Sequence, residues 1–181
     1  MERSSHPRRP RRFLAAAAVA AVCLPTVVVA KQAPEDLLKG RVILSDKPIP
    51  TSWSSVGSYV AQLKAMNKST LWYDKKTGKA KVSYAAFFPQ PINDVQVMLV
   101  LYDITGGAHQ QKMSSENFMN RGDRALFNTV TLDKEDLDGN KKYLFAIEYR
   151  HRIIASTQFT LRMEGPHYSG QVSFTDEETK K

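Results

Sequence analysis

The feature that most limits the possible folds is a series of short, strand-like segments that fills the chain from residue 69 onward. These segments are rich in β-branched and aromatic residues and are separated by glycine, proline and acidic turns, a pattern typical of β-structure. One further candidate lies earlier in the chain, which gives seven or eight strands. The predicted strands cover residues 41–45, 71–73, 80–88, 95–104, 126–132, 143–149, 153–161 and 168–174.

Only one segment has the apolar spacing of a helix. Its apolar side chains recur at intervals of three and four residues, which places them on one helical face. They are Val56, Tyr59, Val60, Leu63 and Met66. Because no helix separates the later strands, we expect antiparallel sheets. The predicted fold class is therefore mainly all-β: an antiparallel β-sandwich with one short N-terminal helix.

Three details of the pattern lead to further predictions. Residues 71–73 and 80–88 flank a turn at 74–79, which predicts a β-hairpin. Residues 95–104 are apolar on both faces, so this strand should be central in its sheet or covered by the helix. Residues 108–124 are polar and irregular, which predicts a long loop.

One stretch resembles the passage from strand E to strand F in immunoglobulin-like and fibronectin type III domains. In those families a leucine precedes a tyrosine whose hydroxyl bonds back to the backbone and closes the corner. Leu137 and Tyr143 hold these two places here. The flanking apolar positions are Val130, Leu132, Phe145 and Ile147. The resemblance implies an immunoglobulin/fibronectin-III-like sandwich, and it implies no function.

The N-terminus has the three parts of an export signal. Residues 1–12 are basic, residues 13–29 carry no charge, and Ala30 ends the segment with a small side chain of the kind that a signal peptidase reads. We therefore predict a signal peptide at 1–30 that is cleaved after Ala30. The protein is then exported, and is periplasmic, outer-envelope or secreted.

Three alternatives use the same residues. An uncleaved N-terminal anchor keeps the apolar run as a membrane tether. A lipoprotein would carry its lipid on Cys23, but Ala20 and Val22 depart from the usual lipobox. A mitochondrial presequence lacks so continuous an apolar run. The export route also stays open, because Arg11 and Arg12 resemble the twin-arginine signal only in part.

The rest of the chain is long enough for one domain. We assign residues 31–40 to a short tether, 41–175 to a single sandwich domain and 176–181 to a charged, disordered tail. Without the leader the chain carries 21 basic and 17 acidic residues, an excess too small to indicate a nucleic-acid binder. Cys23 is the only cysteine, so cleavage would leave a domain without disulfides.

The sequence contains no recognisable catalytic or metal motif. His109, His151 and His167 lie in expected turns and not at metal-ligand spacing. The chain has neither a nucleophile elbow nor a glycine-rich phosphate loop. Residues 133–140 resemble a calcium loop, but Lys134 occupies a position that needs an oxygen donor; a looser calcium site there stays an alternative. We therefore predict a non-enzymatic protein with no cofactor and no metal.

Two surfaces are candidates for binding. The first combines lysines with aromatic residues around the turn at 74–79, a composition that suits anionic polymers. The lysines, at the end of the helix and around this turn, are Lys64, Lys68, Lys75, Lys76, Lys79 and Lys81, with Trp72, Tyr73 and Tyr84 between them. The candidate contact residues among them are Trp72, Tyr73, Lys75, Lys76 and Lys79. The second is the predicted loop at 108–124, which contains His109 and the tripeptide Arg121-Gly122-Asp123, a sequence that integrins bind. Arg121 and Asp123 are its candidate contact residues.

These observations predict an exported binding or structural domain of the cell envelope or extracellular space. Its partner would be an envelope or extracellular protein or an anionic polymer, not nucleic acid, and a membrane only if the leader is retained. One alternative is a small hydrolase or carbohydrate-binding accessory domain that uses Trp72, Tyr73 and His109. Another is a membrane-tethered subunit of an envelope complex. The sequence leaves the oligomeric state open.

Overall fold

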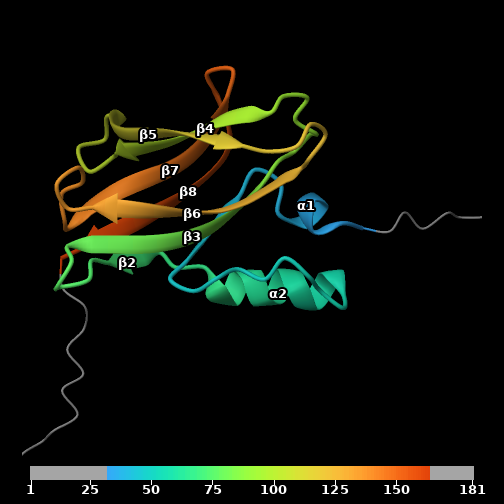
Figure 1. Ribbon diagram of the computed structural model, residues 1–181, viewed down its shortest axis with the longest axis horizontal. Helices are drawn as coiled ribbons and strands as arrows, with labels where there is room; N and C mark the ends of the chain where they lie inside the picture. The colour runs from blue at the N-terminus through green and yellow to red at the C-terminus, as the bar shows by residue number, and fades with distance from the viewer. Residues whose placement is uncertain (1–31, 164–181) are drawn as a thin grey trace, which may run out of the picture. The chain divides into compact units, whose positions relative to one another are not determined.

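The computed structural model describes residues 32–163, in which two helices and eight strands are formed (Figure 1). The helices are α1 (Pro34–Leu37) and α2 (Val56–Met66). The strands are β1 (Val42–Ser45), β2 (Thr70–Trp72), β3 (Lys79–Phe87), β4 (Gln96–Asp103), β5 (Gln110–Phe118), β6 (Ala125–Asp133), β7 (Lys141–Tyr149) and β8 (Arg152–Arg162). The expected leader at 1–30, the expected last strand at 168–174, His167 and the tail at 176–181 lie outside the described residues.

The strands form two sheets that pack face to face. The order is β1-β3-β6 in the three-stranded sheet and β2-β8-β7-β4-β5 in the five-stranded sheet. Neighbouring strands are antiparallel except for β2 and β8, which are parallel. The predicted fold class, a mainly β sandwich with a short helix, is therefore confirmed, and the expectation of purely antiparallel sheets is wrong for this one pair.

The main core fills the space between the sheets. Alternate residues of each strand point inward, as the two-residue period of a strand requires. The largest fully buried side chains there are Leu44, Tyr84, Phe88, Leu99, Leu101, Leu132, Tyr143 and Phe145. β4 lies between β5 and β7, so the prediction that residues 95–104 form a central strand is confirmed.

A second, smaller core lies on the outer face of the three-stranded sheet, which α2 covers. Ser55 caps this helix by accepting the Ser58 N–H (3.3 Å), and Asn67 ends it. Tyr59 and Leu63 from α2 are fully buried against Phe87 of β3. The small sheet is therefore apolar on both faces.

The segment from Pro34 to Leu38 also belongs to this folded unit. α1 begins with a proline, which is favourable in the first turn of a helix. Leu38 is fully buried in the second core, and Asp36 forms an ion pair with Arg124 at 2.9 Å. The region 31–40, expected to be a tether, thus packs against the sandwich from Pro34 onward, because Leu38 has an apolar cluster to fill.

The hairpin expected from residues 71–73 and 80–88 is not formed. β2 pairs with β8 in the five-stranded sheet, whereas β3 pairs with β1 and β6 in the other. The turn itself is present, with Asp74 Oδ1 accepting the N–H groups of Lys76 and Thr77. It carries the chain from one sheet to the other, since a turn sequence fixes a reversal of direction and not the strand that becomes the partner.

The expected loop at 108–124 contains a regular strand instead. β5 forms the edge of the five-stranded sheet and pairs with β4 over its whole length. Asn117 is its only buried residue, so the strand lacks the apolar alternation by which strands are recognised. Polar edge strands of this kind resemble loops in sequence.

The predicted tyrosine corner has its expected hydrogen bond. Tyr143 donates its hydroxyl to the backbone carbonyl of Asp138 at 2.9 Å, and Leu137 beside it is fully buried. A second tyrosine, Tyr73, donates to the carbonyl of Leu137 at 2.7 Å. The acidic segment at 133–140 is therefore held to the core by two phenolic groups.

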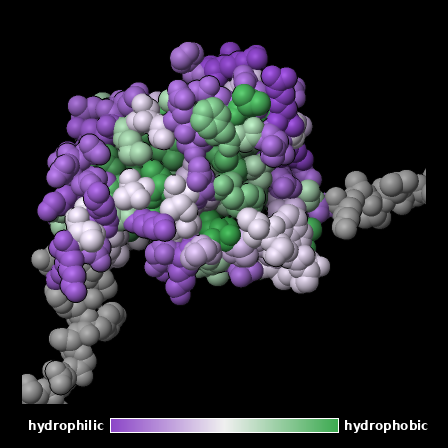
Figure 2. All heavy atoms as spheres, viewed as in Figure 1, coloured by the Kyte–Doolittle hydropathy of each residue, from purple (hydrophilic) through white to green (hydrophobic). Residues whose placement is uncertain are grey.

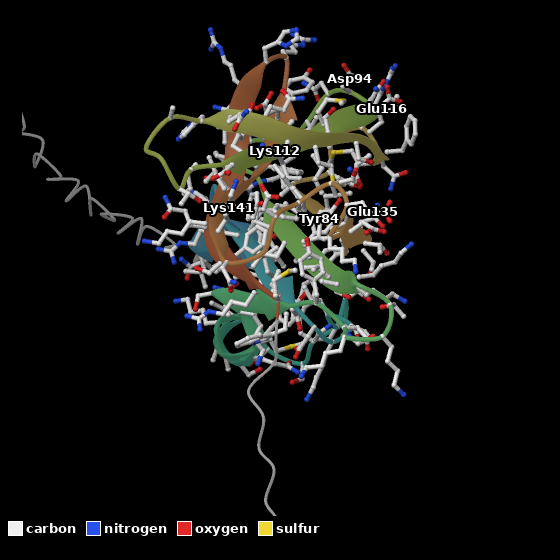
Figure 3. The ribbon with its side chains drawn as sticks, turned by 90° about the vertical axis from the view of Figure 1, so that its left-hand side faces the viewer. Tyr84, Asp94, Lys112, Glu116, Glu135 and Lys141 are labelled. Carbon is white, nitrogen blue, oxygen red and sulfur yellow. The ribbon has the colours of Figure 1, made fainter. Side chains whose placement is uncertain are left out.

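A buried carboxylate lies close to this corner and makes stability depend on pH. Asp103 accepts the Thr105 N–H (2.9 Å) and pairs with the Lys141 ammonium (3.0 Å; Lys141 is labelled in Figure 3). Both contacts lower the pKa of the Asp103 carboxyl, to about 2. Because the folded-state pKa is lower than the unfolded one, this carboxylate stabilises the fold above about pH 4, and the contribution is lost as pH falls from 4 to 2.

We expect Asp103→Asn to reduce the free energy of unfolding at pH 7 by about 1–2 kcal/mol. Urea titrations of wild type and variant at pH 7 and at pH 2 measure this difference. The other carboxylates titrate alike in both proteins, so their effect cancels in the comparison. Because the Asp103 carboxyl is partly protonated at pH 2, the difference in free energy of unfolding between wild type and variant should be smaller there. A gap of the same size at both values would contradict the assigned role of the Asp103 charge.

Candidate functional site

Tyr73 and Lys75 of the lysine-rich candidate surface line a common pocket of about 280 Å³, but Trp72, Lys76 and Lys79 do not line it. Tyr73 is buried, and its hydroxyl donates to the backbone carbonyls of Asp133 and Leu137. Burial also raises the pKa of this phenol. Lys79 pairs with Asp133 at 3.2 Å, Lys75 and Lys76 are exposed on the turn, and the half-buried Trp72 lies under the Arg162 guanidinium (5.5 Å).

The second candidate surface is divided as well. His109 precedes β5 and lies against the Tyr102 ring, with 5.7 Å between ring centres. Arg121 and Asp123 belong to the turn between β5 and β6, where Asp123 accepts from Asn120 (3.1 Å). This turn follows the other end of β5, so His109 is separated from it by the length of the strand.

The residues of the hydrolase alternative also lie apart. Trp72 is on β2 and Tyr73 directly follows it, whereas His109 precedes β5. β2 and β5 form opposite edges of the five-stranded sheet. Trp72, Tyr73 and His109 are therefore not brought into one site.

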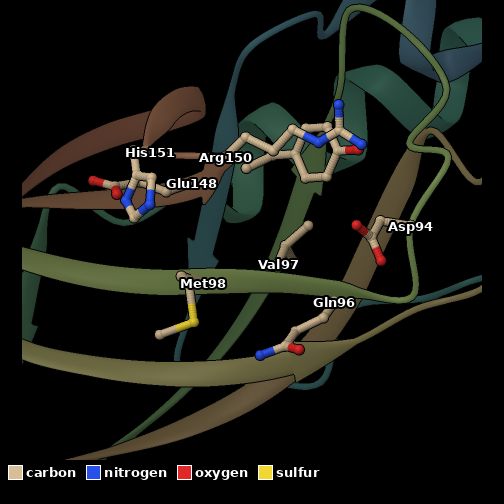
Figure 4. Close-up of a pocket in the computed structure, with 8 residues that line it drawn as sticks. Asp94, Gln96, Val97, Met98, Glu148, Arg150 and His151 are labelled. Carbon is tan, nitrogen blue, oxygen red and sulfur yellow. The ribbon is translucent and has the colours of Figure 1, made fainter.

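A pocket of about 240 Å³ lies instead beside the turn that joins β7 to β8. Its lining residues are Asp94, Gln96, Val97, Met98, Glu148, Tyr149, Arg150 and His151. In Figure 4 the side chains of His151 and Glu148 lie on one side of this pocket and that of Asp94 on the other, with Met98 and Gln96 contributed by β4. Acidic, basic and apolar groups therefore meet at one place.

The turn beside this pocket has a strained backbone. Tyr149 pairs with Arg152, which leaves Arg150 and His151 as the two turn residues. Both have positive φ, 50° and 62°, a region that costs a non-glycine residue about 1–2 kcal/mol. Asparagine and glycine are the usual residues of such turns. The Arg150 guanidinium lies over the Tyr149 ring at 4.9 Å, which orients it at the pocket.

A hydrogen bond fixes the acidic side of the pocket. Tyr102 of β4 donates its hydroxyl to Glu148 of β7, and this bond raises the pKa of the phenol to about 12. The register places Tyr102 opposite Leu144 and Glu148 opposite Met98, so this bond runs along the outer face of the sheet. Ala146 is fully buried although it lies on the outer face. Glu148 is therefore held in place and not free to rotate.

Apolar side chains are exposed next to this pocket, on the outer face of the five-stranded sheet. Phe118, the last residue of β5, is 69% exposed, the highest value among the large apolar side chains that the structure describes. Ile153 lies opposite Glu148, which lies opposite Met98 on the next strand. We call Met98, Phe118 and Ile153 the Phe118 surface. Hydrophobic side chains reach the visible face of the molecule between hydrophilic ones (Figure 2).

This arrangement suits binding of another molecule through an apolar centre with a charged border. Asp94, Glu116, Glu148 and Arg150 supply the charges. Within residues 32–163, no three histidine, cysteine or acidic side chains are grouped so that they could hold a metal ion. No helix in the same residues is long and apolar enough to cross a membrane.

The central residue of this surface, Phe118, could not be identified from the sequence. It falls within the expected loop at 108–124, where a single aromatic residue carries no signal of exposure. Arg150 and His151 lie between the predicted strands at 143–149 and 153–161, and the sequence does not reveal their positive φ values. The register of β4, β7 and β8 is what brings these residues together.

No protein-family model matches the chain, and no curated protein matches it. The residues of the Phe118 surface are therefore the basis for assigning a function.

Proposed function

We propose that the chain is an exported, non-enzymatic binding domain of the cell envelope or extracellular space that holds a protein partner on the Phe118 surface. The observation that carries this proposal is the exposure of Phe118 at the end of strand β5. An ordered aromatic side chain that is 69% exposed keeps apolar area in contact with water, and covering that area is favourable.

The surroundings of Phe118 support a protein as the partner. Ile153 on the same face is 45% exposed, so the exposed apolar area is not limited to Phe118. The border carries both signs of charge, from Glu148 and Arg150 among others, as the rim of a protein interface does. The site is also ordered before binding, because Tyr102 holds Glu148.

The strand order supports an immunoglobulin-like assignment of the domain. If β1, β3 and β6 take the places of strands A, B and E, then β4, β7 and β8 take those of C, F and G. The turn at Arg150 is then the F–G loop, which in variable domains is one of the binding loops. The expected leader at 1–30 supports a partner in the envelope or outside the cell.

Site-specific cross-linking in the cells that make the protein tests this proposal. A photo-reactive phenylalanine analogue replaces Phe118 in one variant and Met163 in the control. Met163 is also an exposed apolar residue (46%), but it follows β8, whereas Phe118 ends β5. We expect discrete cross-linked protein adducts from position 118 and at least fivefold weaker ones from position 163, because apolar contacts concentrate at the centre of an interface.

Two results would count against the proposal. Equal adducts from both positions would mean that position 118 meets other proteins only by collision. A position 118 that gives no adduct, in a variant that folds and is exported, would show that no protein covers this surface.

A further inference from the structure

A second pocket, remote from the Phe118 surface, lies where the three-stranded sheet is incomplete. β1 has four residues and ends at Ser45, whereas its partner β3 continues toward Lys79. The pocket that remains beside this unpaired part of β3 measures about 330 Å³. That volume lies at the lower end of the range of small-molecule sites.

The floor of this second pocket is apolar. Leu71 of β2 and Ala80 and Val82 of β3 line it, and each is at most 5% exposed. Trp72 forms part of the wall. The two strands belong to different sheets, so the floor is the lateral edge of the main core. An apolar part of a bound ligand would therefore have the same apolar surroundings as the core side chains.

A backbone N–H group of β3 points toward this second pocket. Phe88 donates to Arg124 and Phe87 donates to Arg41, so the even-numbered residues of β3 bond toward β6 and the odd-numbered ones toward β1. Lys81 is odd-numbered and therefore directs its N–H and C=O to the side where β1 has ended.

Lys47 would stand opposite Lys81 if β1 continued. Its N–H is instead donated to Ser45 Oγ at 3.0 Å, and Pro48 follows. Among the described residues no strand pairs with Lys81 on this side. The amide of Lys81 is therefore available to an acceptor in the pocket.

The rim of the pocket is basic. Lys68 and Lys81 line it, and both side chains are exposed. Within residues 32–163 neither forms an ion pair. Asp46 also lies on the rim and offsets one of the two positive charges. The rim thus keeps an excess of one positive charge above an apolar floor.

We infer that this pocket binds a small amphipathic carboxylate. Its carboxylate would accept a hydrogen bond from the Lys81 backbone amide and would be attracted by the ammonium groups of Lys68 and Lys81. Its apolar tail would lie on Leu71, Ala80 and Val82. This site is separate from the protein-binding surface proposed above. Within the lysine-rich surface, it assigns anion binding to Lys68 and Lys81, beside the incomplete sheet, in place of Lys75, Lys76 and Lys79.

Octanoate is a suitable probe, followed by NMR on the full chain. We expect a dissociation constant of about 0.1–5 mM, as is usual for a ligand of this size. The amide of Lys81 and the indole N–H of Trp72 should shift during the titration. Trp53, the other tryptophan, stacks on Tyr59 and is not part of the pocket, so its indole signal should stay in place.

Matched variants separate charge from apolar contact. Lys68→Ala/Lys81→Ala should weaken octanoate binding about tenfold. The control Lys64→Ala/Lys112→Ala removes two lysines that do not line the pocket and should leave binding unchanged. Octanamide, which has the same tail and no charge, should bind about tenfold more weakly than octanoate to the wild type.

Three outcomes would overturn the inference. One is the absence of shifts at Lys81 and Trp72 up to 20 mM octanoate. Another is equal weakening by the two pairs of substitutions, which would indicate attraction by overall charge. The third is equal binding of octanamide and octanoate, which would leave an apolar crevice without anion selectivity.

Discussion

Replacing Phe87 with alanine should reduce the free energy of unfolding by about 3–5 kcal/mol. Phe87 is fully buried on the face of the three-stranded sheet that α2 covers, and it meets the Phe127 ring edge to face at 6.0 Å. Its removal opens a cavity beneath Tyr59 and Leu63. Urea-induced unfolding followed by circular dichroism measures the loss.

Phe118→Ala is the matched control for this substitution. It removes the same side chain from a strand, but at a position that is 69% exposed, so we expect a change of no more than about 0.5 kcal/mol. A small effect at Phe87 as well would mean that α2 does not pack on the sheet. The second core would then contribute nothing to stability.

Asn117→Ala should cost about 2 kcal/mol, because it leaves a buried hydroxyl without its acceptor. Tyr84, labelled in Figure 3, is 1% exposed and donates to Asn117 Oδ1 at 2.6 Å, and burial raises the pKa of its phenol. Asn128 donates to the same oxygen at 2.8 Å. The three residues belong to β3, β5 and β6, so this network joins the two sheets.

A double-mutant cycle isolates this interaction. Tyr84→Phe alone removes the donor, and the pair Tyr84→Phe/Asn117→Ala should cost less than the sum of the single changes, by about 1 kcal/mol or more. Gln110→Ala, at an exposed position on the same strand, should have little effect. Strict additivity of the two changes would show that the hydroxyl and the amide do not interact in solution.

The parts of the fold that follow from local pattern were predictable. The stripe from Val56 to Met66 gives α2, and the apolar run at 95–104 gives the central strand. The backbone bond of the Tyr143 hydroxyl was predicted from the resemblance of the stretch around Leu137 and Tyr143 to the E–F corner of immunoglobulin-like and fibronectin type III domains.

What could not be predicted depends on pairing between distant segments. Nothing near residues 70–72 indicates that β2 joins β8, some ninety residues later, because the local turn is equally compatible with a hairpin. β5 was mistaken for a loop because an edge strand with one buried residue has no apolar alternation. Leu38 was assigned to a tether because its apolar partners lie on α2 and β3.

The candidate sites also divide into those that residue type reveals and those that depend on strand pairing. Lys75, Lys76 and Lys79 could be proposed from the sequence because a lysine is charged wherever it lies. The exposure of Phe118 depends on the end of β5, and the free amide of Lys81 depends on where β1 stops. Both are properties of strand length and register, which no single residue encodes.

The native size of the protein tests the central claim, that this domain works by holding a protein partner, most directly. The endogenous chain is released gently from its own cells and followed by antibody on a sizing column, beside a strain that carries Phe118→Ser. We predict that the wild type elutes with a partner and that Phe118→Ser elutes as a lone domain. A wild type that elutes as a lone domain, or a complex that persists in Phe118→Ser, would contradict a binding function centred on this residue.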